Sequence, residues 1–139
     1  MAMSSVALDS ECKLVYNEVQ SKKKHRYVTF KIIEDKTIKV DKIGTRESTY
    51  DQFLTNLYAK DGQDDDCRYA IYDFEFDFTK NAKLIMISWC PDTARIEKKM
   101  IYSASFETLK KTFPKVYKCV EFKNSMDLMV LNKLHPRPM

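Results

Sequence analysis

The chain has 139 residues, of which 44% are hydrophobic and 32% are charged, and its formal net charge is +4. That length suits one domain with its own core, while 12% aromatic residues and only two glycines exclude disordered and fibrous classes. No apolar run approaches the roughly 18 residues of a membrane-spanning helix, and residues 1–10 lack the layout of a signal peptide. We therefore expect one soluble domain over residues 1–139, cytoplasmic or nuclear, with residues 1–8 as a flexible N-terminus.

The first half of the chain carries helical and strand-like patterns in turn. Apolar residues at i, i+3, i+4 and i+7 predict an amphipathic helix over residues 9–20. Alternation and β-branched residues predict strands over residues 27–33 and 37–43, joined as a hairpin by the turn-like residues between them. Thr49 followed by Gln52 forms a capping box that begins a second helix. The acidic residues 61–66 predict a surface loop.

The second half predicts two strands and then a helical region. Residues 68–78 alternate, so one face holds Ala70, Tyr72, Phe74, Phe76 and Phe78. Their neighbours on the other face are acidic, which predicts a solvated face carrying Asp73, Glu75 and Asp77. The continuous apolar run over residues 84–89 predicts a central strand that is covered on both faces.

A helical region opens after Pro91, and Ser105 is a candidate cap for a further helix that ends at residue 113. Residues 116–122 predict a last strand, and residues 126–134 predict a short apolar helix. The element order predicts an α/β (α+β) fold, in which a central mixed β-sheet is sandwiched between helices.

Nothing in the sequence predicts catalysis. Four cysteines are scattered without the paired spacing of a zinc site, which predicts reduced and mostly buried thiols at Cys12, Cys67, Cys90 and Cys119. The turn after Trp89 lacks the second cysteine of a thioredoxin-type motif. Two histidines, His25 and His135, are poorly placed for a catalytic base, and no glycine-rich phosphate loop exists. We expect no enzyme activity, metal or cofactor.

Charge is unevenly distributed along the chain. Residues 79–139 hold twelve Lys or Arg against five acids, whereas residues 61–78 hold one Arg against seven acids. In the helical region, Arg95, Lys98 and Lys99 form a basic stripe with Tyr102 on the same side, while Ile96, Met100 and Ala104 share the other side. A basic stripe beside Met100 is suited to docking on an acidic groove. Nucleic acid is the competing partner, but a charge of +4 is small for phosphate-driven binding.

Five segments of the chain, in order, resemble the actin-depolymerising factor (ADF)/cofilin family. These are residues 4–14 (SSVALDSECKL), 25–32 (HRYVTFKI), 67–76 (CRYAIYDFEF), 87–94 (ISWCPDTA) and 99–105 (KMIYSAS). The resemblance implies a single ADF-homology domain that acts as a monomer, binds actin monomers and filaments with a preference for ADP-loaded subunits, and severs and depolymerises filaments without covalent chemistry.

Site residues are carried over from the matched segments. The resemblance implies contacts with both monomers and filaments through Ser4, Ser5, Val6, Arg95, Lys98, Lys99 and Met100. It implies a filament-only surface that includes Lys36, Lys80 and Lys83. Ser4 matches a regulatory phosphorylation site, and the lysine-bearing helix resembles a surface that responds to phosphoinositide head groups. Residues 22–26 (KKKHR) resemble a basic nuclear-import cluster.

The chain departs from the family pattern at positions that bear on filament binding. Glu97 stands where a basic residue is usual, Asn81 stands where Arg is common, and residues 123–127 are shortened and less acidic. These departures favour an alternative function, in which the protein sequesters monomers or binds filament sides with weak severing. A third hypothesis, a basic adaptor for nucleic acid or lipid, rests only on the charge excess of residues 79–139.

Overall fold

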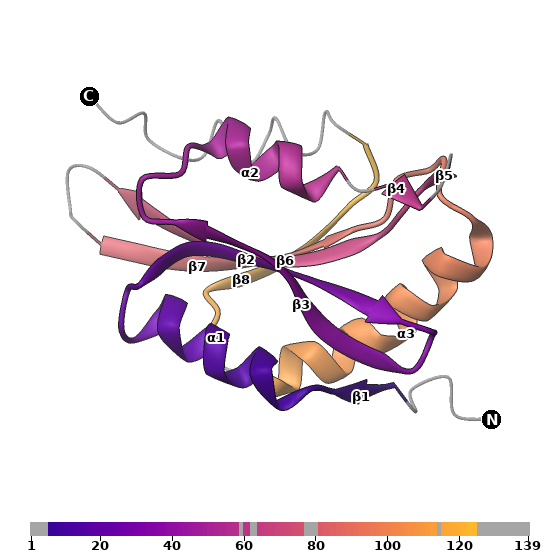
Figure 1. The fold of residues 1–139 in the computed structure, drawn as a ribbon, viewed down its shortest axis with the longest axis horizontal. Coiled ribbons are helices and arrows are strands. Elements are labelled where there is room, and N and C mark those ends of the chain that lie inside the picture. The colour runs from indigo at the N-terminus through magenta and orange to yellow at the C-terminus, as the bar shows by residue number, and fades with distance from the viewer. Residues whose placement is uncertain (1–5, 59, 62–63, 77–80, 114, 125–139) are drawn as a thin grey trace.

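The computed structural model describes residues 6–58, 60–61, 64–76, 81–113 and 115–124. Six strands form one mixed sheet in the order β1 (Ala7–Leu8), β3 (Thr37–Thr45), β2 (His25–Ile33), β6 (Arg68–Phe76), β7 (Asn81–Trp89) and β8 (Lys118–Phe122). Neighbouring strands run antiparallel except for the parallel pairs β1/β3 and β7/β8. Helices α1 (Ser10–Gln20) and α3 (Ile96–Thr112) cover one face of the sheet, and α2 (Tyr50–Leu57) covers the other (Figure 1). The predicted fold class, a mixed sheet between helices, is confirmed.

In chain order the elements are β1 (Ala7–Leu8), α1 (Ser10–Gln20), β2 (His25–Ile33), β3 (Thr37–Thr45), α2 (Tyr50–Leu57), β4 (Lys60–Asp61), β5 (Asp64–Asp65), β6 (Arg68–Phe76), β7 (Asn81–Trp89), α3 (Ile96–Thr112) and β8 (Lys118–Phe122). The predicted hairpin is the β2/β3 pair. The predicted capping box begins α2, because the Gln52 N–H donates to Thr49 Oγ1 at 3.1 Å and the Thr49 N–H donates to Gln52 Oε1 at 2.9 Å.

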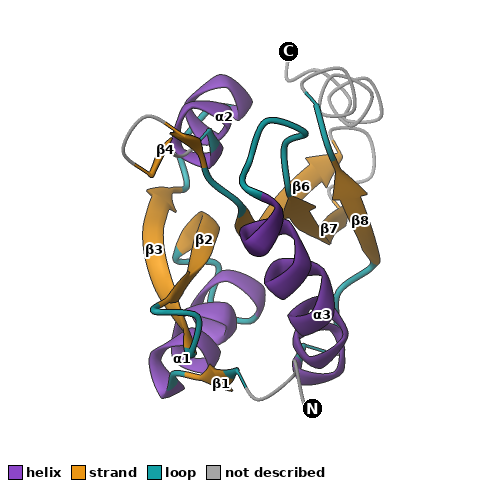
Figure 2. Ribbon diagram, turned by 90° about the vertical axis from the view of Figure 1, so that its right-hand side faces the viewer, coloured by secondary structure: helices purple, strands orange, loops and turns teal. Residues whose placement is uncertain are grey.

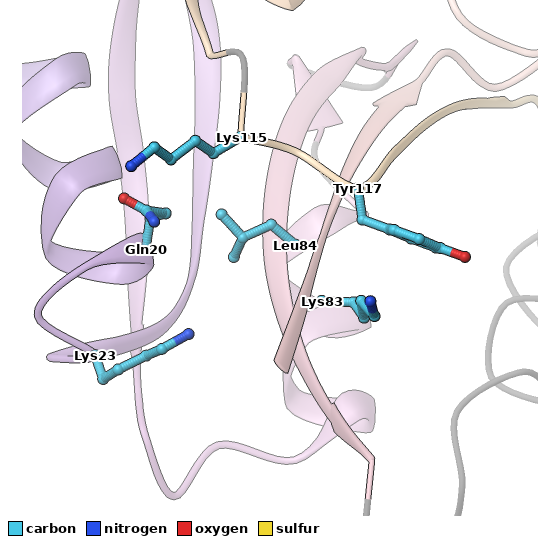
Figure 3. A pocket seen from close by; sticks show the side chains of 6 residues that line it. All are labelled: Gln20, Lys23, Lys83, Leu84, Lys115 and Tyr117. Atoms are coloured by element: carbon cyan, nitrogen blue, oxygen red, sulfur yellow. The ribbon is translucent and has the colours of Figure 1, made fainter. Parts of the chain in front are cut away.

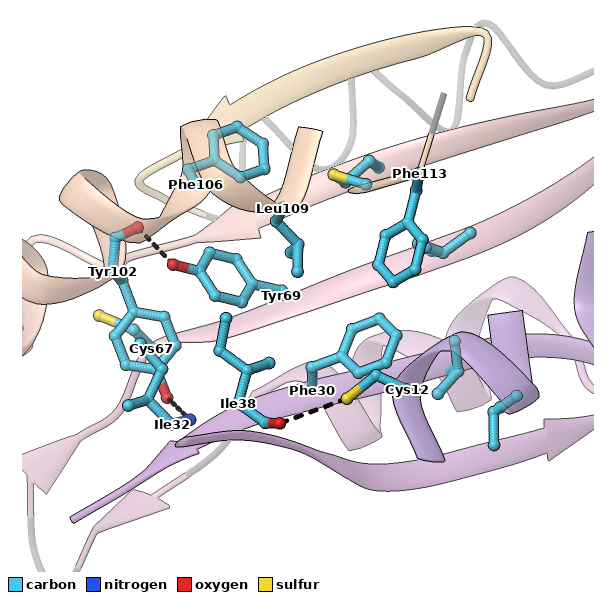
Figure 4. Close-up of a cluster of buried hydrophobic side chains, with 14 of the residues drawn as sticks. Cys12, Phe30, Ile32, Ile38, Cys67, Tyr69, Tyr102, Phe106, Leu109 and Phe113 are labelled. Carbon is cyan, nitrogen blue, oxygen red and sulfur yellow. Dashed lines mark hydrogen bonds between the residues drawn. The ribbon is translucent and has the colours of Figure 1, made fainter. Parts of the chain in front are cut away.

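The sheet has a buried cluster on each face. The cluster under α1 and α3 includes Phe30, Tyr69, Met86, Phe106 and Phe113 (Figure 4). The cluster under α2 is rich in aromatic rings and includes Tyr27, Phe53, Tyr72, Phe74 and Trp89. Alternate residues of β7 enter the two clusters, so the prediction that its apolar run is covered on both faces is confirmed. Both clusters hold the sheet rigid beneath its helices.

The prediction of a solvated face on β6 is wrong. Asp73 is fully buried, and its carboxylate lies 3.0 Å from Lys23 Nζ and 2.9 Å from an Arg46 guanidinium nitrogen. Residues of β6 enter both buried clusters, so both faces of the strand meet cores and an acid there must find cations within the protein. The side chain of Glu75 and all of Asp77 lie outside the described residues.

Two other expectations about elements change. Helix α3 is one continuous helix, and Ser105 is buried in its interior instead of capping a second helix. Part of the predicted acidic loop forms the short antiparallel pair β4/β5. Within residues 1–8, whose flexibility stays a prediction, Ala7 and Leu8 pair with β3 as β1 beside a buried Val6. The predicted helix over residues 126–134 lies outside the described residues.

Candidate functional site

The first two turns of α3 form an exposed surface that is both basic and apolar. We call the set Arg95, Ile96, Lys98, Lys99 and Met100 the α3 surface. The side chains of Ile96 and Met100, one turn apart, are 65% and 54% exposed. The sequence prediction set these two residues opposite a basic stripe that included Tyr102. The structure shows the reverse for Tyr102, which is buried in the core, while the apolar pair lies open beside the cations.

Core contacts of the later turns hold the α3 surface in place. Tyr102, Ser105, Phe106 and Leu109 recur at i, i+3, i+4 and i+7, and all four are buried. The Ile32 N–H donates a hydrogen bond to the Tyr102 hydroxyl at 2.9 Å, and the Tyr69 hydroxyl donates to the Tyr102 carbonyl oxygen (Figure 4). Burial raises the pKa of the Tyr102 hydroxyl, so it stays protonated. The core stripe begins only at Tyr102, so Ile96 and Met100 ahead of it remain exposed.

An acidic residue at position 97 has a local structural explanation. It lies in the first turn of α3, where a negative charge complements the positive end of the helix dipole. Its carboxylate lies 3.8 Å from Arg95 Nε, and both side chains are well exposed. An exposed pair of this kind contributes little to stability. Glu97 therefore lowers the positive charge of the α3 surface.

The β2/β3 turn lies beside the α3 surface, at the end of the molecule that faces the viewer in Figure 2. Lys98 Nζ lies 3.9 Å from Asp35 Oδ1 across this junction. The turn residues Glu34 and Asp35 have φ of 52° and 57°, which makes the reversal tight. Lys36 is exposed here, and its carbonyl oxygen accepts a hydrogen bond from the Ala7 N–H at 2.8 Å.

The structure therefore brings three predicted site segments to one end of the sheet: the α3 surface, Lys36 and Val6. The Val6 side chain is only 8% exposed, so it anchors the N-terminal strand in the core. Ser4 and Ser5, which precede it, lie outside the described residues.

Lys83 lies at the opposite end of the sheet from Lys36. It lines a cavity of about 260 Å³ together with Gln20, Lys23, Leu84, Lys115 and Tyr117 (Figure 3). Its ammonium group lies 4.7 Å from the centroid of the Tyr117 ring, which is a cation–π contact. The predicted filament surface is thus split between two ends of the molecule, and Lys80 lies outside the described residues.

Sequence reasoning missed the neighbours of Lys83. Lys115 and Tyr117 reach it because β8 runs parallel to β7, and the Tyr117 N–H donates to the Leu84 carbonyl oxygen at 2.8 Å. A parallel pairing across a helix leaves no turn signal between the two strands, so no local pattern indicates it. Only the charge excess of residues 79–139 hinted that lysines gather there.

The chemistry of these surfaces suits binding. Within the described ranges, no three His, Cys, Asp or Glu residues gather as metal ligands do. None of the helices that the structure describes is both long and apolar enough to cross a membrane. The α3 surface offers cations for electrostatic steering and two exposed apolar side chains for anchorage.

Comparison with known proteins identifies the family. The family model described as "Cofilin/tropomyosin-type actin-binding protein" matches residues 5–135. Actin-depolymerizing factor 4 of Oryza sativa subsp. japonica is 42% identical over 112 residues, covering 78% of this chain and 77% of the relative. Actin-depolymerizing factor 2 of Arabidopsis thaliana is also 42% identical, over 113 residues, covering 79% of this chain and 78% of the relative.

Solved structures agree with the sequence comparison. Cofilin of Streptomyces griseoflavus superposes with a TM-score of 0.81 at 30% identity, covering 93% of this chain and 94% of the other. The ADF/cofilin of Trypanosoma brucei superposes with a TM-score of 0.73 at 33% identity, covering 96% of each chain. The resemblance inferred from the motifs is therefore confirmed over nearly the whole length, and the chain belongs to the cofilin/tropomyosin-type family of actin-binding proteins.

Proposed function

We propose that this protein binds actin monomers and filaments and promotes filament severing and depolymerisation, and so drives actin turnover. The family match and the plant relatives named as actin-depolymerizing factors support this function. The work is done by differential binding: a protein that prefers one arrangement of filament subunits shifts the filament toward that arrangement. No covalent step is required, so we infer that the protein is not an enzyme and needs no cofactor.

The α3 surface is the observation that carries the proposal. Its three cations lie around two exposed apolar side chains, on a helix whose later turns are fixed in the core. A partner groove with acidic walls and an apolar floor satisfies both parts of this surface. We propose that actin supplies that groove, and that Arg95, Lys98, Lys99 and Met100 contact it in monomers and filaments alike.

The test is a charge-matched pair of double variants. Lys98→Ala with Lys99→Ala should weaken binding to actin monomers several-fold in a fluorescence titration, because two steering charges are lost from the interface. Lys13→Ala with Lys111→Ala removes the same net charge from exposed positions away from the α3 surface and should bind as the parent does. Equal affinity of the two double variants would overturn the assignment of the site.

The N-terminal serines are proposed to belong to the same actin-binding surface. We infer that Ser4 and Ser5, which precede the buried Val6, contribute to the contact and that Ser4 is the regulatory phosphorylation site. A phosphate would add about −2 charge next to a basic surface that must meet an acidic partner. A Ser4→Asp variant should therefore bind actin more weakly than Ser4→Ala in the same titration, and equal binding would remove this part of the proposal.

The proposed function extends to the nucleotide state of actin, the cellular location and competition by lipids. We propose that a monomeric protein, one domain over residues 1–139, binds ADP-loaded actin preferentially and works at the cytoplasmic cytoskeleton, with entry to the nucleus through residues 22–26. We propose that phosphoinositide head groups compete with actin for the lysines of α3. Titration of ADP-actin and ATP-actin, with and without phosphoinositide vesicles, tests both points; equal affinities, or no competition, would contradict them.

A second candidate function is supported by Glu97. Its carboxylate is highly exposed within the α3 surface and lowers the local positive charge. This favours a protein that sequesters monomers or binds filament sides and severs weakly. Single-filament microscopy separates the two functions, since prompt fragmentation at a low ratio of protein to actin subunits supports severing. A nucleic-acid adaptor is disfavoured, because Lys98 lies at one end of the sheet whereas Lys83 and Lys115 lie at the other.

A further inference from the structure

Two of the four cysteines meet at the end of the β6/β7 pair where α3 begins. Arg68 pairs with Trp89 in the antiparallel register, Cys67 directly precedes Arg68, and Cys90 directly follows Trp89. One further step of this register sets the two cysteines opposite each other. Both also pack on the same core cluster, under α1 and α3. The two thiols interact, and their interaction raises the pKa of Cys67 and lowers the pKa of Cys90.

This placement suits a disulfide. Directly opposed residues of an antiparallel pair have Cα atoms about 4.5–5.5 Å apart. A disulfide spans Cα separations of about 4.4–6.8 Å. Cys67 and Cys90 directly follow the last registered pair of these strands, so the register places them at a separation that a disulfide can span.

The two thiols differ in exposure and in acidity. Cys67 is fully buried, whereas Cys90 is half-buried and lines a cavity of about 240 Å³ whose wall also includes Ser88, Lys99 and Glu121. The interaction with Cys67 lowers the pKa of Cys90, against the opposing effect of burial. The Ser88 hydroxyl, 4.0 Å from the sulfur, and the charge of Lys99 act in the same direction as Cys67, while Glu121 opposes them. Cys90 is thus the more exposed thiol of the pair and the one whose deprotonation is favoured, so it is the thiol that an oxidant meets.

From this geometry we propose that Cys67 and Cys90 form an oxidisable thiol pair that closes to a reversible disulfide in the presence of a peroxide. The Cys90 thiolate attacks one oxygen of hydrogen peroxide, breaks the O–O bond and becomes a sulfenic acid, while the departing hydroxide takes up a proton and leaves as water. The Cys67 sulfur then attacks the sulfenic sulfur, its proton leaves with the hydroxyl as a second water, and the S–S bond forms. Two thiols are oxidised and one peroxide is reduced.

The remaining thiols provide matched controls. Cys12 donates a hydrogen bond to the Ile38 carbonyl oxygen at 3.3 Å, and burial raises its pKa to about 12 (Figure 4). Cys119 lies on β8, where it pairs with Met86, four residues before Cys90 along β7. Neither has the opposed partner that Cys67 and Cys90 provide for each other.

The test is oxidation of the full-length reduced protein with hydrogen peroxide, followed by non-reducing peptide mapping by mass spectrometry. We expect a peptide pair linked through Cys67 and Cys90, at the mass of two lost hydrogens, which dithiothreitol separates. Cys90→Ser should abolish the link, whereas Cys12→Ser and Cys119→Ser should retain it. Circular dichroism of Cys90→Ser shows whether it folds, and Cys90→Ala replaces it if it does not.

Two results would overturn the proposal. One is a parent protein in which Cys90 accumulates as a sulfinic acid while Cys67 remains a free thiol. The other is a disulfide that joins Cys90 to Cys119 or to a second chain. Because every readout is a mass, the result does not depend on actin binding.

Discussion

Replacing Tyr102 with Phe tests how α3 is attached to the sheet. Pairing between β2 and β6 extends along β2 as far as Phe30, opposite Tyr69. Two residues further on, the Ile32 N–H donates to the Tyr102 hydroxyl at 2.9 Å. The hydroxyl thus takes the place of a strand partner beyond the point where β6 begins. Tyr102→Phe removes this acceptor and leaves the buried N–H unsatisfied.

The size of the effect follows from burial. Both residues are at most 4% exposed, so solvent does not readily replace the lost partner. An orphaned buried donor costs about 1–3 kcal/mol. The ring itself is kept, including its packing on Tyr69 at a centroid distance of 5.0 Å. Removal of a buried hydroxyl recovers part of the cost, so we expect the free energy of unfolding to fall by about 1–2 kcal/mol.

Urea unfolding measures this change, with Tyr117→Phe as the control. Tyr117 is 65% exposed, and its contact with Lys83 uses the ring, so loss of its hydroxyl should change the free energy of unfolding by less than about 0.5 kcal/mol. Equal stabilities of the two variants would show that the Ile32 N–H does not depend on Tyr102, and the account of how α3 is anchored would be wrong.

Two further predictions concern other parts of the fold. Gly44→Ala should destabilise the protein by about 1–3 kcal/mol in the same assay, since an added Cβ would lie 2.0 Å from Cε2 of the buried Tyr27 ring; a neutral result would contradict this packing. Glu18→Gln should lower stability near neutral pH, because the hydrogen bond from His25, 2.9 Å away, lowers the pKa of Glu18 in the folded state. A lowered folded pKa gives stability above the unfolded pKa of about 4.3 that is lost as the pH falls through the folded value. The two proteins should therefore converge in acid, and a difference that is constant from pH 7 to pH 3 would contradict the reasoning.

Local patterns predicted most of the elements but not all of their environments. The capping box at Thr49 and the β2/β3 hairpin depend on residues close in sequence, and both are present. The sequence predicted a solvated Asp73 because the cations that pair with it are distant in sequence: Lys23 is 50 residues away and Arg46 is 27 residues away. An acid that alternates with aromatic residues can be solvated, or it can be buried and paired with cations distant in sequence, and the local pattern does not distinguish the two.

The candidate site was predicted in part for the same reason. The family motifs and the helical spacing indicated the α3 surface, but the side of the helix that Tyr102 occupies depends on where the sheet lies. The separation of Lys36 from Lys83 follows from strand order, and the meeting of Cys67 with Cys90 follows from register. Neither property is encoded by spacing within one segment.

The continuity of α3 has a consequence for the thermodynamics of binding. One helix of 17 residues carries the α3 surface on its first turns and core residues on its later ones. The docking face is therefore preorganised, and a partner does not have to compensate for ordering a loop. Association through this face should show a heat-capacity change set by the apolar area that is buried, without the larger contribution of coupled folding. Its dissociation rate should then respond to contacts within the interface more than to changes in helix propensity.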